Sequence, residues 1–139
     1  MIWLLKVTLS SGAYATGDWE GVMEMDASTS LEELHLAIQK AVNFDNDHMY
    51  EFFTARTERG RKQEIFDLEN GAMYEQTLAD LFPLPDKLNL YYRFDYGDEW
   101  HFKITKTRQS PSEPVPGVTY PRLRQETGAK PEQYPDGEE

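Results

Sequence analysis

The sequence predicts an α+β domain in which a mixed β-sheet packs on one main helix. Several segments alternate between apolar and polar residues, as half-buried strands do. One segment carries apolar residues at helical spacing and a capping motif at its start. The chain has 139 residues, the usual size of a single domain with its own core.

The first third of the chain predicts two strands followed by a helix. Alternation predicts strands over residues 1–9 and 19–25, joined as a hairpin. The helix is expected to begin after Ser30, because Ser30 and Glu33 fit a capping box, and to end near Asn43. The apolar stripe of this helix contains Leu31, Leu34, Ile38, Ala41 and Val42.

The following segments predict four more strands and one helical turn. The strands are expected over 48–55, 64–68, 88–95 and 100–105, and the helical turn over 77–82. This order of elements matches the β-grasp architecture of ubiquitin-like folds, with the strand at 100–105 as an extra C-terminal hairpin strand. A shared fold does not by itself define a function.

The composition changes after residue 108. Six of the eight prolines follow this point, and the apolar periodicity disappears. We therefore divide the chain into a single domain at 1–108 and a Pro-rich acidic arm at 109–139. The arm is expected to dock partly on the domain through its apolar residues at 118–121, and its end is expected to be mobile.

Charge and composition restrict the possible functions. The chain has 25 Asp and Glu against 14 Lys and Arg, a net charge of −11, which argues against attraction to nucleic acid or an anionic membrane. The absence of cysteine excludes a disulfide framework, a thiolate metal site and a cysteine nucleophile. No signal peptide or membrane-spanning run is recognisable, so we expect a cytoplasmic protein without a membrane partner.

One basic cluster stands out from this acidic background. Arg56, Arg59, Arg61 and Lys62 lie close together on the turn between two predicted strands. Such a cluster could bind phosphate or an acidic partner. A solvated loop that offsets nearby acidic residues is the simpler interpretation, and both remain open.

Three segments together resemble one protein family. Residues 31–52 contain a Leu-His pair, an Ile-Gln-x-Ala helix and an aromatic-Asp-x-x-His-x-x-x-Phe exit. The sequence LADLFP at 78–83 leads into the hairpin at 92–104, and YPR at 120–122 is followed by GAKPEQ at 128–133. These segments resemble the Ri-plasmid ORF-three-like family, whose members occur on plasmids and as passengers of mobile elements. The motif residues are Leu34, His35, Ile38, Gln39, Asp45, His48, Phe52, Tyr92, Asp95, Gly97, Asp98, Trp100, Tyr120, Pro121, Pro131 and Glu132.

The chain departs from the family pattern at two places. The family commonly has histidine two residues after the hairpin tryptophan, whereas this chain has Phe102 there and His101 one residue earlier. A move of one residue along a strand places the side chain on the opposite face. Family tails often carry cysteines, and this tail has none. Because the family has no established activity, the resemblance supports an interaction or accessory module more than an enzyme.

The histidines and hairpin acids are the weak candidates for chemistry. His35, His48 and Asp98 could hold a metal ion if they converged, and with Glu99 they would suit a metal-assisted hydrolase. The simpler interpretation is a hydrogen-bonded His35 at the edge of the core and an Asp98 that builds a turn. The sequence contains no H-x-H or H-E-x-x-H spacing, so we assign no metal, cofactor or catalytic residue.

The leading hypothesis is a non-enzymatic protein-interaction or accessory domain that binds another protein or a second copy of itself. It predicts an exposed aromatic patch, for which Tyr91 and Tyr96 are the candidates, and an unpaired sheet edge. The alternatives are weak nucleic-acid association through the basic turn and a metal-assisted hydrolase.

Overall fold

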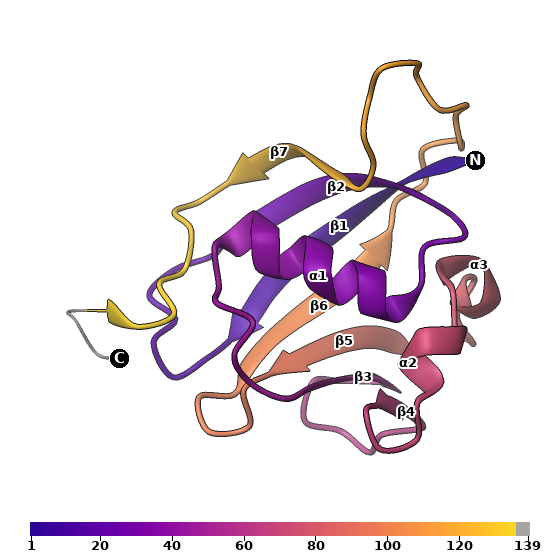
Figure 1. Ribbon diagram of the computed structural model, residues 1–139. Coiled ribbons are helices and arrows are strands. Elements are labelled where there is room, and N and C mark those ends of the chain that lie inside the picture. The colour runs from indigo at the N-terminus through magenta and orange to yellow at the C-terminus, as the bar shows by residue number, and fades with distance from the viewer. Residues whose placement is uncertain (136–139) are drawn as a thin grey trace.

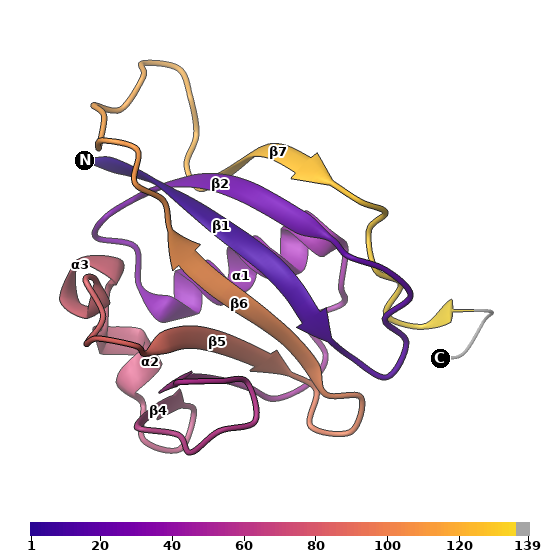
Figure 2. The same cartoon turned by 180° about the vertical axis from the view of Figure 1, so that it is seen from behind.

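One antiparallel sheet dominates the fold (Figures 1 and 2). The computed structural model describes residues 1–135. The strands are β1 (Ile2–Ser11), β2 (Glu20–Asp26), β3 (Tyr50–Ala55), β4 (Glu64–Asp67), β5 (Asn89–Phe94), β6 (Trp100–Lys106) and β7 (Arg122–Thr127). The helices are α1 (Leu31–Val42), α2 (Ala72–Glu75) and α3 (Leu78–Leu81). Helix α1 crosses one face of the sheet, and the two short helices lie beside its end.

The sheet topology differs from the expected one. The seven strands have the order β4-β3-β5-β6-β1-β2-β7, and all neighbouring pairs are antiparallel. The predicted β-grasp α+β fold with a mixed sheet is therefore wrong. A β-grasp sheet pairs its first strand in parallel with a later strand, whereas here β6 lies between β1 and β5 and is antiparallel to both. The regular secondary structure within residues 1–135 is mainly sheet, and of its three helices only α1 is longer than four residues.

A tight turn explains this topology. The backbone N–H of Glu99 donates to the carbonyl of Asp95 at 2.6 Å, so the chain reverses directly after β5. Such a reversal makes β6 the antiparallel neighbour of β5, and β6 then occupies the place beside β1. The two predicted hairpins, β1–β2 and β5–β6, are confirmed. What the sequence pattern does not show is that β6 lies beside β1.

Helix α1 has the predicted start and end. The Ser30 hydroxyl accepts a hydrogen bond from the Glu33 backbone N–H at 3.1 Å, and the Glu33 carboxylate accepts one from the Ser30 backbone N–H at 3.0 Å. The helix ends at Asn43, which has a left-handed backbone with φ of 59°. This capping box and the predicted helix bounds are confirmed.

The main core lies between α1 and the sheet. Leu31, Leu34 and Ile38 of the helix are fully buried. The inward-facing side chains of β5 and β6 belong to the same core, as the sequence pattern predicts. The buried members on these two strands are Leu90, Tyr92, Phe94, Trp100, Phe102 and Ile104.

The opposite face of the sheet carries a smaller core that contains Phe53, Ala55 and Tyr91. Tyr91 is only 5% exposed and stacks on Phe53, with ring centres 5.4 Å apart. The expectation that Tyr91 is an exposed recognition residue is therefore wrong, because the loop after β3 covers this face. Lys62 of that loop lies 4.8 Å from the Phe53 ring centre. Tyr96, in the β5–β6 turn, is exposed as predicted.

The C-terminal arm adds a strand to the sheet. Strand β7 pairs with β2 and forms one edge of the sheet, which sequence reasoning missed because its residues are mostly polar and exposed. Beyond it, residues 130–135 run beside the loop that follows α1. The expected mobile end of the arm falls in part on residues 136–139, which lie outside the described residues.

Candidate functional site

A buried hydrogen-bond network joins α1 to β5, and we call it the His35 cluster (His35, Gln39, Asn46 and Tyr92). His35 Nε2 lies 2.7 Å from Asn46 Oδ1, and His35 Nδ1 lies 2.5 Å from Tyr92 Oη. Gln39 Nε2 donates to the same Tyr92 oxygen at 2.9 Å, and Gln39 Oε1 accepts from the Asn46 backbone N–H at 2.9 Å. The His35 ring also stacks on Tyr50, with ring centres 3.5 Å apart.

The His35 cluster holds a neutral imidazole. The Asn46 oxygen can only accept, so His35 Nε2 carries the proton and Nδ1 accepts the Tyr92 hydroxyl hydrogen. Burial lowers the pKa of His35 to about 4, although the hydrogen bond to Asn46 raises it. Both ring nitrogens are thus used within the protein, which is the structural role that the simpler interpretation gave to His35.

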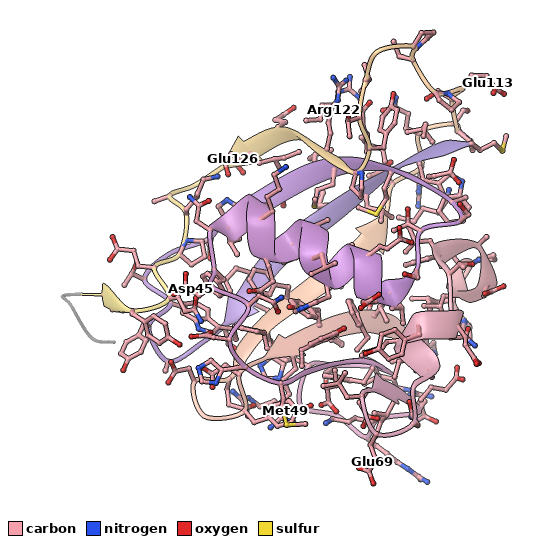
Figure 3. All side chains as sticks on the ribbon, viewed as in Figure 1. Asp45, Met49, Glu69, Glu113, Arg122 and Glu126 are labelled. Carbon is pink, nitrogen blue, oxygen red and sulfur yellow. The ribbon has the colours of Figure 1, made fainter. Side chains whose placement is uncertain are left out.

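A second set of hydrogen bonds fastens the C-terminal tail, and we call it the tail cluster (Asp45, Asp47, His48, Gln133 and Tyr134). The buried Gln133 side chain accepts from the Asp45 backbone N–H at 2.7 Å and donates to Asp47 Oδ1 at 2.8 Å. The Tyr134 hydroxyl donates to Asp47 Oδ2 at 2.6 Å and lies 2.8 Å from His48 Nε2. Figure 3 shows Asp45 beside the tail.

The tail cluster favours an ionised Asp47. Burial raises the pKa of Asp47, but the hydrogen bonds from Tyr134 and Gln133 and the nearby His48 outweigh it and leave that pKa below its usual value. His48 Nε2 also lies 3.3 Å from Asp95 Oδ2, so the helix exit, the β5–β6 turn and the tail meet at one place. The tail cluster is therefore an attachment site at the surface.

The hairpin motif builds a turn. Asp95 Oδ1 accepts hydrogen bonds from the backbone N–H groups of Gly97 at 3.0 Å and Asp98 at 3.1 Å. Trp100 is fully buried and contacts Phe44, with ring centres 5.0 Å apart. These contacts explain why the resemblance includes an Asp, a Gly and a Trp at this spacing, because each stabilises the hairpin.

The proposed metal candidates do not share one site. His35 binds Tyr92 and Asn46 in the interior, whereas His48 lies at the surface beside Asp95 and Tyr134. Glu99 pairs with Arg93, a residue of the opposite sheet face. Within residues 1–135, no group of three or more His, Cys, Asp or Glu side chains is arranged to hold a metal ion.

A polar cavity of about 270 Å³ lies on the sheet face away from α1, and we call it the far-face pocket. Its lining consists of Phe53, Glu58, Arg59, Gly60, Lys62, Arg93, Glu99 and His101. A chain of ion pairs runs beside it. Lys62 Nζ lies 2.6 Å from Glu51 Oε2, Arg93 Nη1 lies 3.2 Å from the same oxygen, and Arg93 Nη2 lies 2.5 Å from Glu99 Oε2.

Only two of the four residues of the predicted basic cluster line the far-face pocket. Arg59 and Lys62 line the pocket, whereas Arg56 and Arg61 are exposed and take no part in its lining. His101, the residue displaced from the family pattern, reaches this pocket because its position on β6 faces away from α1. Sequence reasoning missed Arg93 and Glu51, since they come from strands distant in the chain.

A groove of about 420 Å³ is lined by residues of α1, of the edge strand β7 and of the chain around them, and we call it the α1–β7 groove. Its lining consists of Met23, Ala37, Lys40, Ala41, Thr119, Pro121, Arg122, Leu123 and Lys130. Lys130 Nζ donates to the Ala41 carbonyl at 3.0 Å and to Glu126 at 2.7 Å, and Arg122 Nε donates to Glu24 at 2.6 Å. Figure 3 shows Arg122 and Glu126 along β7.

The remaining motif residues belong to the arm. Tyr120 Oη accepts from the Val115 backbone N–H at 3.2 Å, and Pro121 lines the α1–β7 groove. Pro131 is buried, while Glu132 is exposed near Asp45. Gln133 and Lys130 hold the tail in place. Both lie in the GAKPEQ segment that resembles the family, but the motif residues taken from it were Pro131 and Glu132, because single polar residues in a polar segment look like solvated ones.

The fold and these clusters define an antiparallel-sheet protein whose sequence motif is built into its interior and its tail attachment. The chain belongs to the plasmid pRiA4b ORF-3-like protein family, whose pattern matches residues 4–137, so the suspected resemblance is confirmed. Neither this family description nor the similar structure below states an activity.

A protein of unknown function from Methanosarcina mazei Go1, MM3350, has a similar crystal structure. The two chains share 22% sequence identity with a TM-score of 0.71, over 90% of this chain and 68% of that chain. At this identity the similarity shows the fold alone. No curated protein matches the chain. The helices within residues 1–135 are too short or too polar to cross a membrane.

Proposed function

We propose that the protein is a non-enzymatic protein-interaction domain whose α1–β7 groove binds an acidic, partly apolar segment of another protein. The observation that carries this proposal is the lining of the groove. Three cations, Lys40, Arg122 and Lys130, surround an apolar floor in a chain with a net charge of −11. Such local complementarity selects an acidic partner and speeds its approach.

In this proposal the cations of the groove bind carboxylates of the partner, and the apolar floor binds an aliphatic side chain. Arg122 and Lys130 are held in place by Glu24 and Glu126, so they define the two ends of the groove. Lys40 is exposed in the last turn of α1, where it can meet a carboxylate of the partner. Ala37 and Leu123 are only partly buried, and together they offer apolar surface for an aliphatic side chain.

Two further features support an interaction domain. The motif histidines and Asp95 already bind other residues of the chain, which leaves them little freedom for acid–base chemistry. Strand β7 is the last strand of the sheet, and the backbone groups of an edge strand can pair with an added segment. The cytoplasmic location remains a prediction that accompanies this proposal.

A peptide-binding experiment tests the proposal. We expect fluorescence anisotropy to detect binding of a labelled peptide of alternating glutamate and leucine, and not of one of alternating lysine and leucine. Lys40→Glu should weaken binding about tenfold or more, since it replaces an attraction by a repulsion. Arg56→Glu is the matched control, because it makes the same charge change at an exposed position outside the groove.

Three results would count against the proposal. The acidic peptide could fail to bind, or both charge reversals could weaken it equally, which would indicate a general charge effect. Sedimentation could instead reveal a dimer that Lys40→Glu dissociates, and the groove would then be a contact between two copies. A salt-dependent shift of short duplex DNA that Arg59→Glu abolishes would favour nucleic-acid association.

A further inference from the structure

The far-face pocket has two sides. One side comes from Phe53 on β3, Arg93 on β5 and His101 on β6, and the other comes from the loop at 56–63. Two bonds hold the loop on the sheet: Lys62 Nζ donates to the buried Glu51 at 2.6 Å, and the Ser11 hydroxyl donates to Glu58 at 2.7 Å. A preformed polar cavity of this kind binds a ligand without first ordering a loop.

The cations of this pocket are unequally occupied. Lys62 and Arg93 both pair with Glu51, and Glu99 is saturated by Arg93, because Arg93 Nε lies 3.1 Å from both of its oxygens and Nη2 lies 2.5 Å from one. The hydrogen bonds from Arg93 keep the pKa of Glu99 below its usual value, so this carboxylate stays paired. The Arg59 side chain is 74% exposed, and its ion pair with Glu58 spans 3.9 Å, so its guanidinium remains largely available to a ligand.

The imidazole of His101 is oriented toward the same ligand. His101 is 4% exposed, and its Nδ1 lies 3.0 Å from the backbone carbonyl of Glu99. Because a carbonyl oxygen only accepts, Nδ1 carries a proton, and Nε2 is the ring nitrogen left for the pocket. A neutral Nε2 accepts a hydrogen bond from a protonated phosphate, and a protonated Nε2 donates to a phosphate dianion.

We propose that the far-face pocket binds a phosphate group, either inorganic phosphate or a small phosphate monoester, through Arg59, Lys62 and His101. Arg59 supplies the planar fork that matches phosphate oxygens, and Lys62, which gives one N–H to Glu51, has two further ammonium N–H groups for the ligand. A neutral His101 distinguishes monoprotonated phosphate from sulfate, which at neutral pH has no proton to offer. The cavity of about 270 Å³ admits a compact phosphate ester.

A titration with inorganic phosphate and with glycerol 2-phosphate, at constant ionic strength set by chloride, tests this site. We expect a saturable shift of the His101 ring resonances in NMR spectra with both probes. Arg59→Ala should weaken phosphate binding about tenfold or more, and Arg59→Lys should restore part of the affinity. Arg56→Ala and Arg61→Ala are matched controls in the same loop, and they should leave the affinity unchanged.

Several outcomes would overturn the proposal. The His101 resonances could fail to respond to either probe, or the three arginine variants could weaken binding equally, which would mean that the loop attracts anions only by its total charge. Sulfate that competes as well as phosphate would contradict the role of His101. Circular dichroism of each variant shows whether its fold is intact, and exposed Arg59 can be replaced without removing a buried contact.

Discussion

The His35 cluster and the tail cluster both draw residues from the stretch at 35–48, but the first is buried and the second lies at the surface. His35 is 2% exposed inside the protein, and its ring bonds involve Tyr92 and Asn46. The His48 side chain is 40% exposed, and its partners are Asp95 and a tail residue, Tyr134. Both histidines are among the residues on which the resemblance to the family was recognised. The comparison teaches that one motif can combine an interior network with a surface attachment.

The physical reason for the difference is access to water. A buried polar group must find its partners within the protein, and losing one costs the full desolvation penalty. A polar group at the surface can exchange a lost partner for water, so its bonds contribute less. The two clusters should therefore respond very differently to the same kind of change.

The largest expected effect is on the pH dependence of the unfolding free energy, to which His35 should contribute much more than His48. The folded-state pKa of His35 is about 4, against an ordinary value of 6.5, so the folded state favours the neutral ring. This contribution to the unfolding free energy is fully present above pH 6.5. About 3 kcal/mol of it is lost as the pH falls from 6.5 toward 4, because His35 in the unfolded chain binds a proton at a higher pH than His35 in the folded protein. Urea unfolding across this range should show the loss in the wild type. His35→Gln should remove most of this slope and His48→Asn should retain it, and equal slopes in the two variants would contradict the comparison.

The next effect tests the interior network directly. Tyr92→Phe removes the oxygen that accepts from Gln39 and contacts His35, so two buried polar groups lose their partner. We expect unfolding free energy to fall by about 2 kcal/mol in urea titrations. Tyr74→Phe, at a tyrosine that is 53% exposed, is the control and should change stability by less than about 0.5 kcal/mol. Similar losses in both variants would show that the network contributes little.

A smaller effect is expected in the tail cluster. Gln133→Ala removes two hydrogen bonds, one from the Asp45 backbone N–H and one to Asp47. We expect hydrogen exchange at the Asp45 amide to become about tenfold faster, since about 1.4 kcal/mol of local protection is lost. Glu132→Ala, at the exposed neighbouring position, should leave this amide unchanged. If amides of the main core also exchange faster, the tail contributes to global stability and the comparison needs revision.

The smallest effect is expected for the exposed histidine. His48→Asn should lower the unfolding free energy by less than about 1 kcal/mol, because its contacts with Asp95 and Tyr134 are partly solvated. Thermal unfolding beside the Tyr92→Phe variant gives the measurement. If His48→Asn lowers the unfolding free energy as much as Tyr92→Phe does, then the surface contacts of His48 stabilise the fold as strongly as the buried network, contrary to expectation.

Much of the local structure could be predicted from the sequence. Ser30 and Glu33 marked the start of α1, and alternation correctly assigned the inward residues of β5 and β6. These features depend on neighbours within a few positions along the chain. The same alternation gave Tyr91 an outward direction, which is correct, but it could not show that the loop at 56–63 covers that face.

The candidate sites were predicted only in part. Arg59 and Lys62 were recognised as basic residues, but their separation from Arg56 and Arg61 depends on how the loop lies over the sheet. The cationic lining of the α1–β7 groove was not predicted at all, because Lys40 and Lys130 lie far apart in the sequence. Neither site has a local sequence signature, so each becomes visible only when distant elements meet.

The family, the helix with its caps and the inward faces of β1, β2, β5 and β6 follow from the sequence alone, since they depend on local periodicity and on short motifs. Three features depend on the folded structure: β6 lies between β1 and β5, β7 completes the sheet, and Gln133 fastens the tail. Several strand pairings and tail positions fit the local sequence equally well, so packing and hydrogen bonds between distant segments select one of them. The net charge of −11 likewise says nothing of the two basic sites, because charge becomes local only when the chain folds.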